Sequence, residues 1–344
     1  MSRTNFLNRM RSGVRAFVEA FSENEAAADE TGFDMPTAMG WSVSCADEAW
    51  MLTVDRILAE GVGGDDRTGT GTRAVFGNML RVPLTRDGVD VLPVVSIKKT
   101  NHADAIAELQ WMLSGSDSLV PLLQRGIHIW SEWPQAAYNK ATGDSLTKKE
   151  FEQRVMEDEA FAAEWGVIDP CYGTQMRRYP TAEGPFDQMT QLIAEIRASA
   201  SSRRLIWNLW MPSLTVVKGG TGLPPCHYEG QVSVKNGTLS LLVTMRSWDV
   251  GLGFAYNVAQ YGWFAHLLAR MTGNRPGELI MSSHDTHLYA NHIDPIMTVL
   301  DRETRPDPRI VWNRTPSSLD DLSMDDFAVE GYEPQPFLKL PVAV

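Results

Sequence analysis

LPPCHYEGQVSV, residues 223–234, is the stretch from which the fold of this chain is most directly predicted. Two prolines come immediately before Cys226, and each proline ring fixes its own φ angle. The residues after the cysteine lead into a second β-rich run from Leu239 to Met245, a pattern typical of adjacent strands. We therefore expect Cys226 to lie where a rigid turn enters a β-sheet.

Cys226 allows three interpretations. A lone cysteine is most often a small buried hydrophobic residue. A catalytic pair with His227 is disfavoured, because neighbouring side chains on an extended chain point to opposite faces. The third interpretation is a thiolate nucleophile served by groups from elsewhere in the chain, with a pKa lowered by nearby arginines.

The composition indicates a soluble, cytoplasmic protein with one large domain. The chain has 344 residues, of which 43% are hydrophobic, enough for a large core. No apolar run reaches the roughly 18 residues that a membrane span needs, and no apolar segment follows the basic N-terminus. Three cysteines without a Cys-x-x-Cys pair predict neither disulfides nor a zinc site. A formal net charge of −12 argues against a nucleic-acid partner.

The chain divides by composition into an arm and a domain. Residues 1–45 have little apolar patterning, so we expect an appended, partly flexible arm. Residues 46–344 are expected to form a single domain, in which the polar segment 134–165 is an insertion. Periodicity predicts helices at 46–60, 101–113, about 148–163, 186–200 and 258–271, and strands at 79–84, 90–97 and 205–210.

The loop from Asp65 to Thr72 is rich in glycine and hydroxyl residues around Arg67. It lacks the Gly-Lys-Ser/Thr ending of a nucleoside triphosphate loop. Arg67 and free backbone N–H groups could still hold a monophosphate, while a glycine-rich β-turn is the alternative. Residues 169–177 are predicted to form another glycine-containing turn.

Glu108 is flanked by apolar residues in a predicted helix. If it is buried, its pKa would be raised and it could exchange protons near neutral pH; a solvated helix glutamate is the alternative. Trp130 and Trp133 are spaced as an aromatic wall for a flat ligand, or as core packing.

Two arginine-containing segments suit a small phosphate. Arg203 and Arg204 at a strand entry could clamp a phosphate with paired N–H donors, or lie in solvent. The segment from Arg246 to Asn257 brings Arg, Ser, Asp and Asn close to one helix N-terminus, a natural anion site. His284 to His292 is interpreted as sugar-contacting rather than as a metal site.

With these motifs in their order, the chain resembles the thymidylate synthase family, which includes the phage pyrimidine hydroxymethylases. The resemblance covers about residues 46–344. It is carried by Asp66 to Thr72, Trp130, Tyr172-Gly173, Ser202-Arg203-Arg204, Pro225-Cys226-His227, Arg246-Ser247, Asn257, Asp285 to Tyr289 and the tail Pro341 to Val344.

The resemblance implies an α+β fold, in which a large mixed sheet packs against helices and two subunits form a homodimer sheet to sheet. It implies dUMP as substrate, 5,10-methylenetetrahydrofolate as cosubstrate and no metal. The implied catalytic residues are Cys226, Glu108, Tyr172, His227, Asn257 and Trp130. The implied nucleotide contacts are Arg67, Arg246, Ser247, Asp249, Asn257, His287 and Tyr289, with Arg203 and Arg204 donated across the dimer interface. The implied folate pocket is lined by Ile129, Trp130, Trp133, Leu223, Asp249, Leu252, Gly253, Tyr256 and Ala343.

The chemistry independently requires these parts. C5 of uracil is a poor nucleophile until a thiolate adds at C6 and makes an enolate, so a cysteine, a phosphate anchor, a proton relay and a second, aromatic-walled pocket are needed.

The chain also departs from the family pattern. It has His284 for a usual Gly, Met176 for Trp, Met245 for Gln, Ala255 for Pro, and Gly230 begins a run where an aromatic is expected. Two products therefore stay open. Hydride transfer to give dTMP and dihydrofolate is expected, whereas a water positioned by His284 would give 5-hydroxymethyl-dUMP and tetrahydrofolate. A non-catalytic nucleotide-binding relative is the alternative from another class.

Overall fold

The computed structural model describes residues 41–66, 68–168, 172–212 and 224–342. The arm 1–40 and the predicted site residues Arg67, Leu223 and Ala343 lie outside these ranges.

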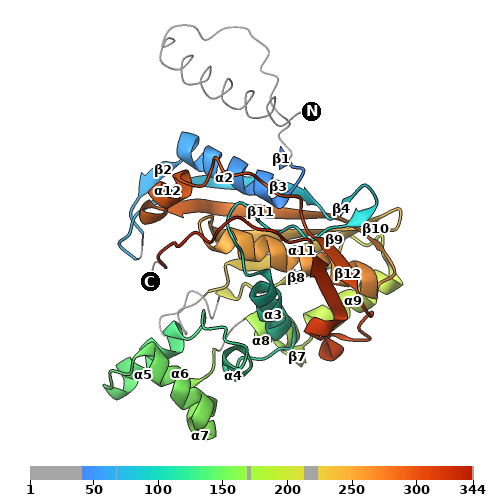
Figure 1. The fold of residues 1–344 in the computed structure, drawn as a ribbon. Coiled ribbons are helices and arrows are strands. Elements are labelled where there is room, and N and C mark those ends of the chain that lie inside the picture. Colours follow the sequence, from blue (N-terminus) through green and yellow to red (C-terminus); the bar gives the residue numbers. More distant parts are fainter. Residues whose placement is uncertain (1–40, 67, 169–171, 213–223, 343–344) are drawn as a thin grey trace. The chain divides into compact units, whose positions relative to one another are not determined.

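A seven-stranded mixed sheet forms the centre of the described chain (Figure 1). Its strands run in the order β1-β3-β11-β10-β9-β8, and β2 pairs with β3. Their bounds are β1 Trp41–Ser42, β2 Val62–Gly64, β3 Thr72–Pro83, β8 Ile206–Asn208, β9 His227–Lys235, β10 Thr238–Asp249 and β11 Arg275–Tyr289. β10 pairs antiparallel with β9 and parallel with β11, which confirms the expected mixed sheet.

Buried and half-buried side chains alternate along β10, so one face of the sheet is buried. Leu239, Leu241 and Val243 are buried, while Ser240 and Thr244 between them are only half-buried. Successive strand residues point to opposite faces, so the apolar set faces the core and the other set faces away from it.

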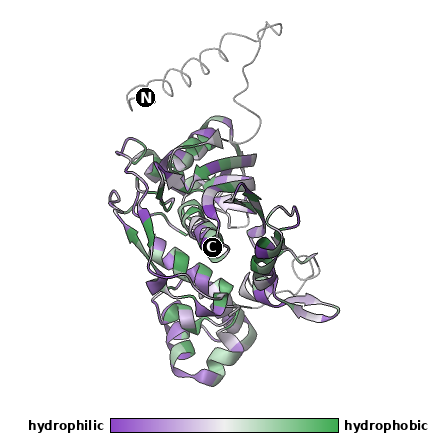
Figure 2. Ribbon diagram, turned by 90° about the vertical axis from the view of Figure 1, so that its right-hand side faces the viewer, coloured by the Kyte–Doolittle hydropathy of each residue, from purple (hydrophilic) through white to green (hydrophobic). Residues whose placement is uncertain are grey.

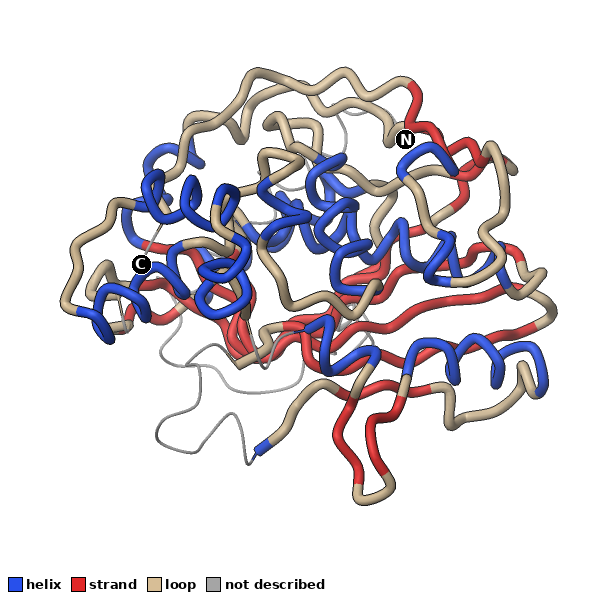
Figure 3. Tube along the Cα trace, turned by 90° about the horizontal axis from the view of Figure 1, so that it is seen from below, coloured by secondary structure: helices blue, strands red, loops and turns tan. Residues whose placement is uncertain are grey.

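Three helices pack near the buried face: α2 (Ala46–Glu60), α3 (His102–Leu113) and α11 (Gly253–Met271). α11 packs on β10 and β11, and α3 packs on α11; Figure 3 shows the helices mainly on one side of the strands. α11 begins at Gly253 rather than at the predicted residue 258. The Asp249 carboxylate organises this start by accepting hydrogen bonds from the backbone N–H groups of Gly251 at 2.8 Å and Leu252 at 3.3 Å.

The segment 132–165 has a small aromatic core of its own. It contains α5 (Glu132–Thr142), α6 (Lys148–Glu157) and α7 (Glu159–Trp165). The rings of Tyr138 and Phe161 lie 5.1 Å apart, and the Arg154 guanidinium lies 4.2 Å from the centre of the Phe161 ring. Figure 2 shows hydrophobic and hydrophilic residues alternating along these helices, at the bottom of the view.

The single helix predicted at about 148–163 is therefore wrong. Asp158 ends α6 and begins α7, because its side chain accepts a hydrogen bond from the Phe161 backbone N–H at 3.0 Å. A capping carboxylate of this kind starts a new helix in a new direction.

Three other predictions need correction. Of the predicted strand 90–97, only Asp90 lies in a strand, β5 (Val89–Asp90). The N–H groups further on bond elsewhere: Ser96 and Ile97 donate to the Asp47 carboxylate at 2.7 and 3.0 Å. β8 is shorter than the predicted strand 205–210. The described part of the predicted turn 169–177 is a helix, α8 (Tyr172–Arg177).

The other helices include α9 (Gln188–Ala198), close to the predicted 186–200, α4 (Val120–Leu123) and α12 (Ala290–Met297). The small strand pairs are β4 (Thr85–Arg86) with β5, β6 (Tyr179–Thr181) with β7 (Gly184–Phe186), and β12 (Arg309–Trp312) with β13 (Phe327–Glu330). Within the described ranges, no helix combines the length and apolarity that crossing a membrane requires.

Candidate active site

Cys226 lies immediately before β9, as its flanking prolines predict. Arg246 holds this turn: its guanidinium donates to the carbonyl oxygens of Pro224 at 2.9 Å and Pro225 at 3.0 Å. The backbone N–H of Arg246 donates to the Cys226 carbonyl at 2.8 Å. The same guanidinium reaches the Cys226 Sγ at 3.5 Å, so one arginine fixes both the backbone and the thiol.

The pKa of the Cys226 thiol is raised, whereas the nearby arginines led us to expect a lowered pKa. Burial raises the pKa of the thiol, and this effect exceeds the lowering by Arg246 and by the Tyr172 hydroxyl. The arginine therefore lies where we expected, but the unliganded thiol is protonated at neutral pH.

Tyr172 and His227 lie against the cysteine. The Tyr172 hydroxyl accepts a hydrogen bond from the Cys226 backbone N–H at 2.7 Å, and the Tyr172 and His227 rings stack 4.0 Å apart. His227 Nδ1 bonds to the Tyr261 hydroxyl on α11, not to Cys226. Burial lowers the pKa of His227 to about 3, so the imidazole is neutral and cannot form a thiolate–imidazolium pair with its neighbour.

Glu108 on α3 is buried, and each of its two carboxyl oxygens accepts a hydrogen bond. Trp130 Nε1 donates to Oε1 at 2.6 Å, and Gln260 Nε2 donates to Oε2. Burial raises the pKa of Glu108 to about 7, although both donors oppose the rise. The expected proton-exchanging carboxyl is confirmed in its burial and its direction of shift.

Asn257 continues this row of hydrogen bonds. Its Nδ2 donates to Gln260 Oε1 at 3.1 Å, and its Oδ1 accepts from Trp248 Nε1 at 3.1 Å. Gln260 is three residues after Asn257, so both lie on the same face of α11. The row connects the predicted base-contacting amide to the predicted proton-exchanging carboxyl.

The parallel pairing of β10 with β11 assembles the predicted nucleotide contacts. Ser247 pairs with Asp285 and Asp249 pairs with His287, next to Arg246 in the chain. His287 is buried, and its Nδ1 bonds to Asp285 at 2.7 Å. The Tyr289 ring lies 5.2 Å from the His287 ring, so these residues occupy one end of the sheet.

The described residues of the predicted folate pocket form two groups. Trp130 and Trp133 have ring centres 5.7 Å apart, and Ile129 and Trp133 keep 45% and 37% of their surface exposed. Such partly exposed aromatic surface fits a flat ligand. The second group, at the start of α11, contains Asp249, Leu252, Gly253 and Tyr256, all half-buried.

The structure does not bring every predicted residue to Cys226. Arg203 and Arg204 are exposed and make no ion pair with another described residue. In the loop after β2, the Asp66 carboxylate accepts hydrogen bonds from the N–H groups of Thr68 at 3.0 Å and Gly71 at 2.8 Å. These two groups are not free for a phosphate, which corrects that part of the prediction. Among the described residues, no group of His, Cys, Asp or Glu is arranged to hold a metal.

Comparison with known proteins decides the family. The thymidylate synthase family model matches residues 48–344. A thymidylate synthase from Rhizorhabdus wittichii is 40% identical over 306 residues, which cover 85% of this chain and 97% of the relative. One from Zymomonas mobilis is 38% identical, covering 87% of this chain and all of the relative, and one from Cereibacter sphaeroides is 41% identical, covering 81% and 92%.

The chain belongs to the thymidylate synthase family.

The family pattern has an aromatic residue in the run that begins at Gly230 here. In this chain an aromatic side chain from the neighbouring strand packs at that position. Trp207 on β8 pairs with Gly230 on β9, and a Cβ on Gly230 would lie 2.0 Å from the indole. Trp207 is buried. In this member of the family the bulk above the strand therefore comes from Trp207, and only glycine fits opposite it.

The other departures from the family pattern are packing changes in the described structure. Met176, Met245 and Ala255 are all buried. The ring of His284 lies 6.1 Å from that of Phe76 and 5.9 Å from that of Tyr228, in a row of rings along the sheet.

Sequence reasoning missed Trp248, Gln260 and Tyr261. The signal for Gln260 was available, since a glutamine three residues after Asn257 stands out in an apolar helix. No comparable signal pointed to Trp248 or Tyr261, because both read as core aromatics.

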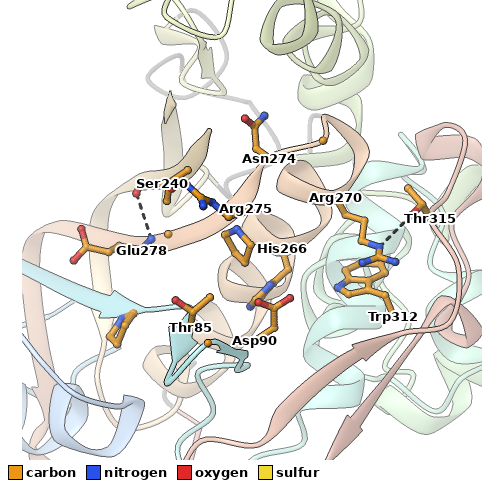
Figure 4. Close-up of a pocket in the computed structure, with 16 residues that line it drawn as sticks. Thr85, Asp90, Ser240, His266, Arg270, Asn274, Arg275, Glu278, Trp312 and Thr315 are labelled. Carbon is orange, nitrogen blue, oxygen red and sulfur yellow. Dashed lines mark hydrogen bonds between the residues drawn. The ribbon is translucent and has the colours of Figure 1, made fainter. Parts of the chain in front are cut away.

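A cavity of about 930 Å³ lies away from this site (Figure 4). Its lining includes Asp90, Ser240, Arg270, Arg275 and Glu278, at the start of β10 and β11 rather than at their ends. None of the predicted site residues lines it.

Proposed function

We propose that this protein makes dTMP by transferring a one-carbon unit from 5,10-methylenetetrahydrofolate to C5 of dUMP, with Cys226 as the nucleophile. The observation that carries the proposal is the pairing of Cys226 Sγ with the Arg246 guanidinium at 3.5 Å, beside the buried carboxyl of Glu108. Membership of the thymidylate synthase family supports the same reaction.

The first step forms a bond from Cys226 Sγ to C6 of the uracil ring, and the ring electrons move to C5 and O4 as an enolate. Burial keeps the thiol protonated before substrate binds, so the Sγ–H bond has to break and its proton has to pass to solvent as the bond to C6 forms. Arg246 stabilises the thiolate as it forms. Asn257 can donate to O4 and accept from N3–H, which favours the enolate.

In the second step C5 attacks the methylene carbon of the folate, and the bond from that carbon to one of its two folate nitrogens breaks. The C5 proton then passes to a base of the protein while the bond to the second folate nitrogen breaks and tetrahydrofolate departs. Glu108, Tyr172 and His227 make up the proton network. Glu108 suits this role because its pKa of about 7 lets it accept and donate protons at neutral pH. His227 remains a neutral hydrogen-bonding group.

The reaction ends when tetrahydrofolate gives a hydride to the exocyclic methylene, the Cys226–C6 bond breaks, and dTMP and dihydrofolate leave. Exclusion of water favours this ending over hydration. The aromatic wall of Trp130 and Trp133 supports it, as does the position of His284 in the row of rings with Phe76 and Tyr228. The folate cosubstrate would lie along the tryptophans and the start of α11.

We also infer a homodimer formed by the uncovered face of the sheet. On this surface Phe76 is 83% exposed and Ile206 47% exposed. The rings of Phe76, His284, Tyr228 and Trp210 follow one another at 5.9 to 6.1 Å. Such an apolar row needs a partner, and the guanidinium groups of Arg203 and Arg204, which make no ion pair with another described residue, would reach the partner's phosphate site.

Mixing two inactive variants tests the shared site. Cys226→Ser and the double variant Arg203→Ala/Arg204→Ala are each expected to be inactive. If the arginines act across the interface, a mixed dimer has one site with both an intact cysteine and intact arginines, and activity returns. No recovery after subunit exchange would place the arginines in the site of their own subunit.

A covalent adduct tests the nucleophile. Incubation with 5-fluoro-dUMP and methylenetetrahydrofolate should add the mass of both molecules to the peptide that contains Cys226, because fluorine cannot leave C5 as a proton does. A protein that binds the nucleotide without any adduct would be a non-catalytic relative.

A further inference from the structure

Four side chains form one directional row of hydrogen bonds behind the nucleotide site. Trp248 Nε1 donates to Asn257 Oδ1 at 3.1 Å, Asn257 Nδ2 donates to Gln260 Oε1 at 3.1 Å, and Gln260 Nε2 donates to Glu108. Asn257 is the residue that the proposed function assigns to the pyrimidine edge. Trp248 and Gln260 have no assigned role.

The first donor in this row cannot change direction. An indole N–H donates and never accepts, so the atom of Asn257 that faces it has to be the carbonyl oxygen. Trp248 is itself held still: it is buried and stacks on Phe254 with ring centres 4.4 Å apart and an interplanar angle of 15°.

The far end of the row has the same direction. When Glu108 is ionised its carboxylate only accepts, and Gln260 then turns its NH₂ toward Glu108 and its oxygen toward Asn257. Gln260 is 1% exposed, so its amide is shielded from bulk solvent. Both neighbours of Asn257 therefore require the same orientation of its amide.

This orientation matters because an asparagine amide can match either pyrimidine. With Oδ1 toward N3 and Nδ2 toward O4 it complements uracil, which has a donor at N3 and an acceptor at O4. Turned by 180°, the same amide complements cytosine, which has an acceptor at N3 and a donor at N4. Asparagine alone therefore does not choose the base.

We propose that Trp248 and Gln260 are the residues that set the base specificity, because they lock the Asn257 amide in the orientation that fits uracil. This inference rests on the proposed function only in taking Asn257 as the base contact. A turned amide would face its NH₂ to the Trp248 N–H and its oxygen to the Gln260 oxygen. Two partly buried hydrogen bonds would be lost at once, so cytosine is rejected.

The chain also shows why Gln260 is needed. The usual family glutamine before Arg246 is Met245 here, and Met245 is buried. A thioether cannot donate a hydrogen bond. Gln260 on α11 accepts the hydrogen bond from Asn257 Nδ2.

The test measures the binding of dUMP and dCMP by calorimetry, without cosubstrate, for wild type and variants. Trp248→Phe keeps the ring that stacks on Phe254 and removes the N–H. Gln260→Leu removes both amide ends at similar volume. Each should narrow the dUMP preference over dCMP by roughly tenfold, mainly through tighter dCMP binding, since each loses about one orienting hydrogen bond.

Two matched controls separate specificity from packing. Trp263→Phe changes a buried tryptophan on α11, the helix of Asn257 and Gln260, and Gln110→Leu changes a buried glutamine on α3, the helix of Glu108. The side-chain nitrogens of Trp263 and Gln110 have no hydrogen-bond partner among the described residues. Both controls should keep the wild-type preference within about twofold.

The outcomes distinguish this proposal from the proposed function. Folded Trp248→Phe and Gln260→Leu variants that keep the wild-type preference would overturn the lock, as would loss of folding in both, which would make them structural supports. A wild type that prefers dUMP but forms no dTMP would contradict the proposed reaction and leave the lock intact.

Discussion

The two ends of β10 differ in how their polar groups are satisfied. At the end near Arg246, Glu108, Gln260 and Asn257 bond to one another in a buried row. At the start of the strand, Arg270 donates to Thr315 at 3.0 Å and Arg275 donates to the Asn236 carbonyl at 2.9 Å, around the open cavity of about 930 Å³ (Figure 4).

The comparison shows that volume alone does not identify the reactive site. The groups around the cavity are satisfied locally by loop carbonyls and hydroxyls. The groups near Cys226 include a thiol and a carboxyl whose pKa values are both raised by burial. Perturbed groups held close together indicate chemistry, whereas a large polar hollow does not.

The largest expected effect is at Cys226. Cys226→Ser should lower kcat on the order of 10⁴-fold, because a hydroxyl does not supply the thiolate that adds to C6. The dissociation constant for dUMP should change only about twofold, since the phosphate and ribose contacts come from other residues. Calorimetry and a turnover assay measure the two quantities; near-normal turnover would contradict the proposed mechanism.

Glu108 should have the next largest effect. Glu108→Gln should lower kcat by about 100-fold or more, since general acid–base groups contribute at least that much. The raised pKa of about 7 predicts an inflection of the pH–kcat profile near that pH, absent in Glu108→Gln. Gln260→Leu removes a donor that favours the carboxylate, so the pKa of Glu108 rises and the inflection moves to higher pH. An unchanged profile in both variants would exclude Glu108 as the titrating group.

Asn257→Asp should change the substrate preference rather than the fold. A protonated aspartic acid can donate to N3 of cytosine and accept from N4. We expect the ratio of kcat/KM for dCMP to that for dUMP to rise by roughly 10- to 100-fold. A wild type that already prefers dCMP would show that Asn257 does not contact the base as proposed.

The smallest effect is expected at the cavity. Arg270→Ala and Arg275→Ala should leave kcat/KM for dUMP unchanged and shift the free energy of unfolding by about 0.5 kcal/mol or less. Their side chains bond to exposed loop atoms. A strong loss of activity in either variant would mean that the two ends of the strand are coupled.

Much of the fold could be predicted from local sequence. The apolar spacing of α2 and the alternation of β10 are local signals, and the structure confirms both. The predicted strand 90–97 failed because Asp47, distant in sequence, takes the backbone donors of Ser96 and Ile97. Hydrogen bonds between residues that are distant in sequence do not change the local spacing of apolar residues, so that spacing cannot predict them.

The position of Cys226 could be predicted from the sequence, but the electrostatics around it could not. The two prolines predicted a turn at the entry to a strand, and the structure has Cys226 immediately before β9. The raised pKa of the thiol depends on burial by the assembled sheet and helices, which no linear pattern contains. Trp248 was missed for the same reason, since only the fold shows that its N–H points at Asn257.

The most direct test of the account is to incubate the protein with dUMP and methylenetetrahydrofolate and identify both products together. The proposed mechanism predicts that dihydrofolate, measured by its absorbance, forms in equal amount to a nucleotide with the mass of dTMP. Tetrahydrofolate together with a nucleotide heavier than dTMP by one oxygen atom would contradict it and identify a hydroxymethylase.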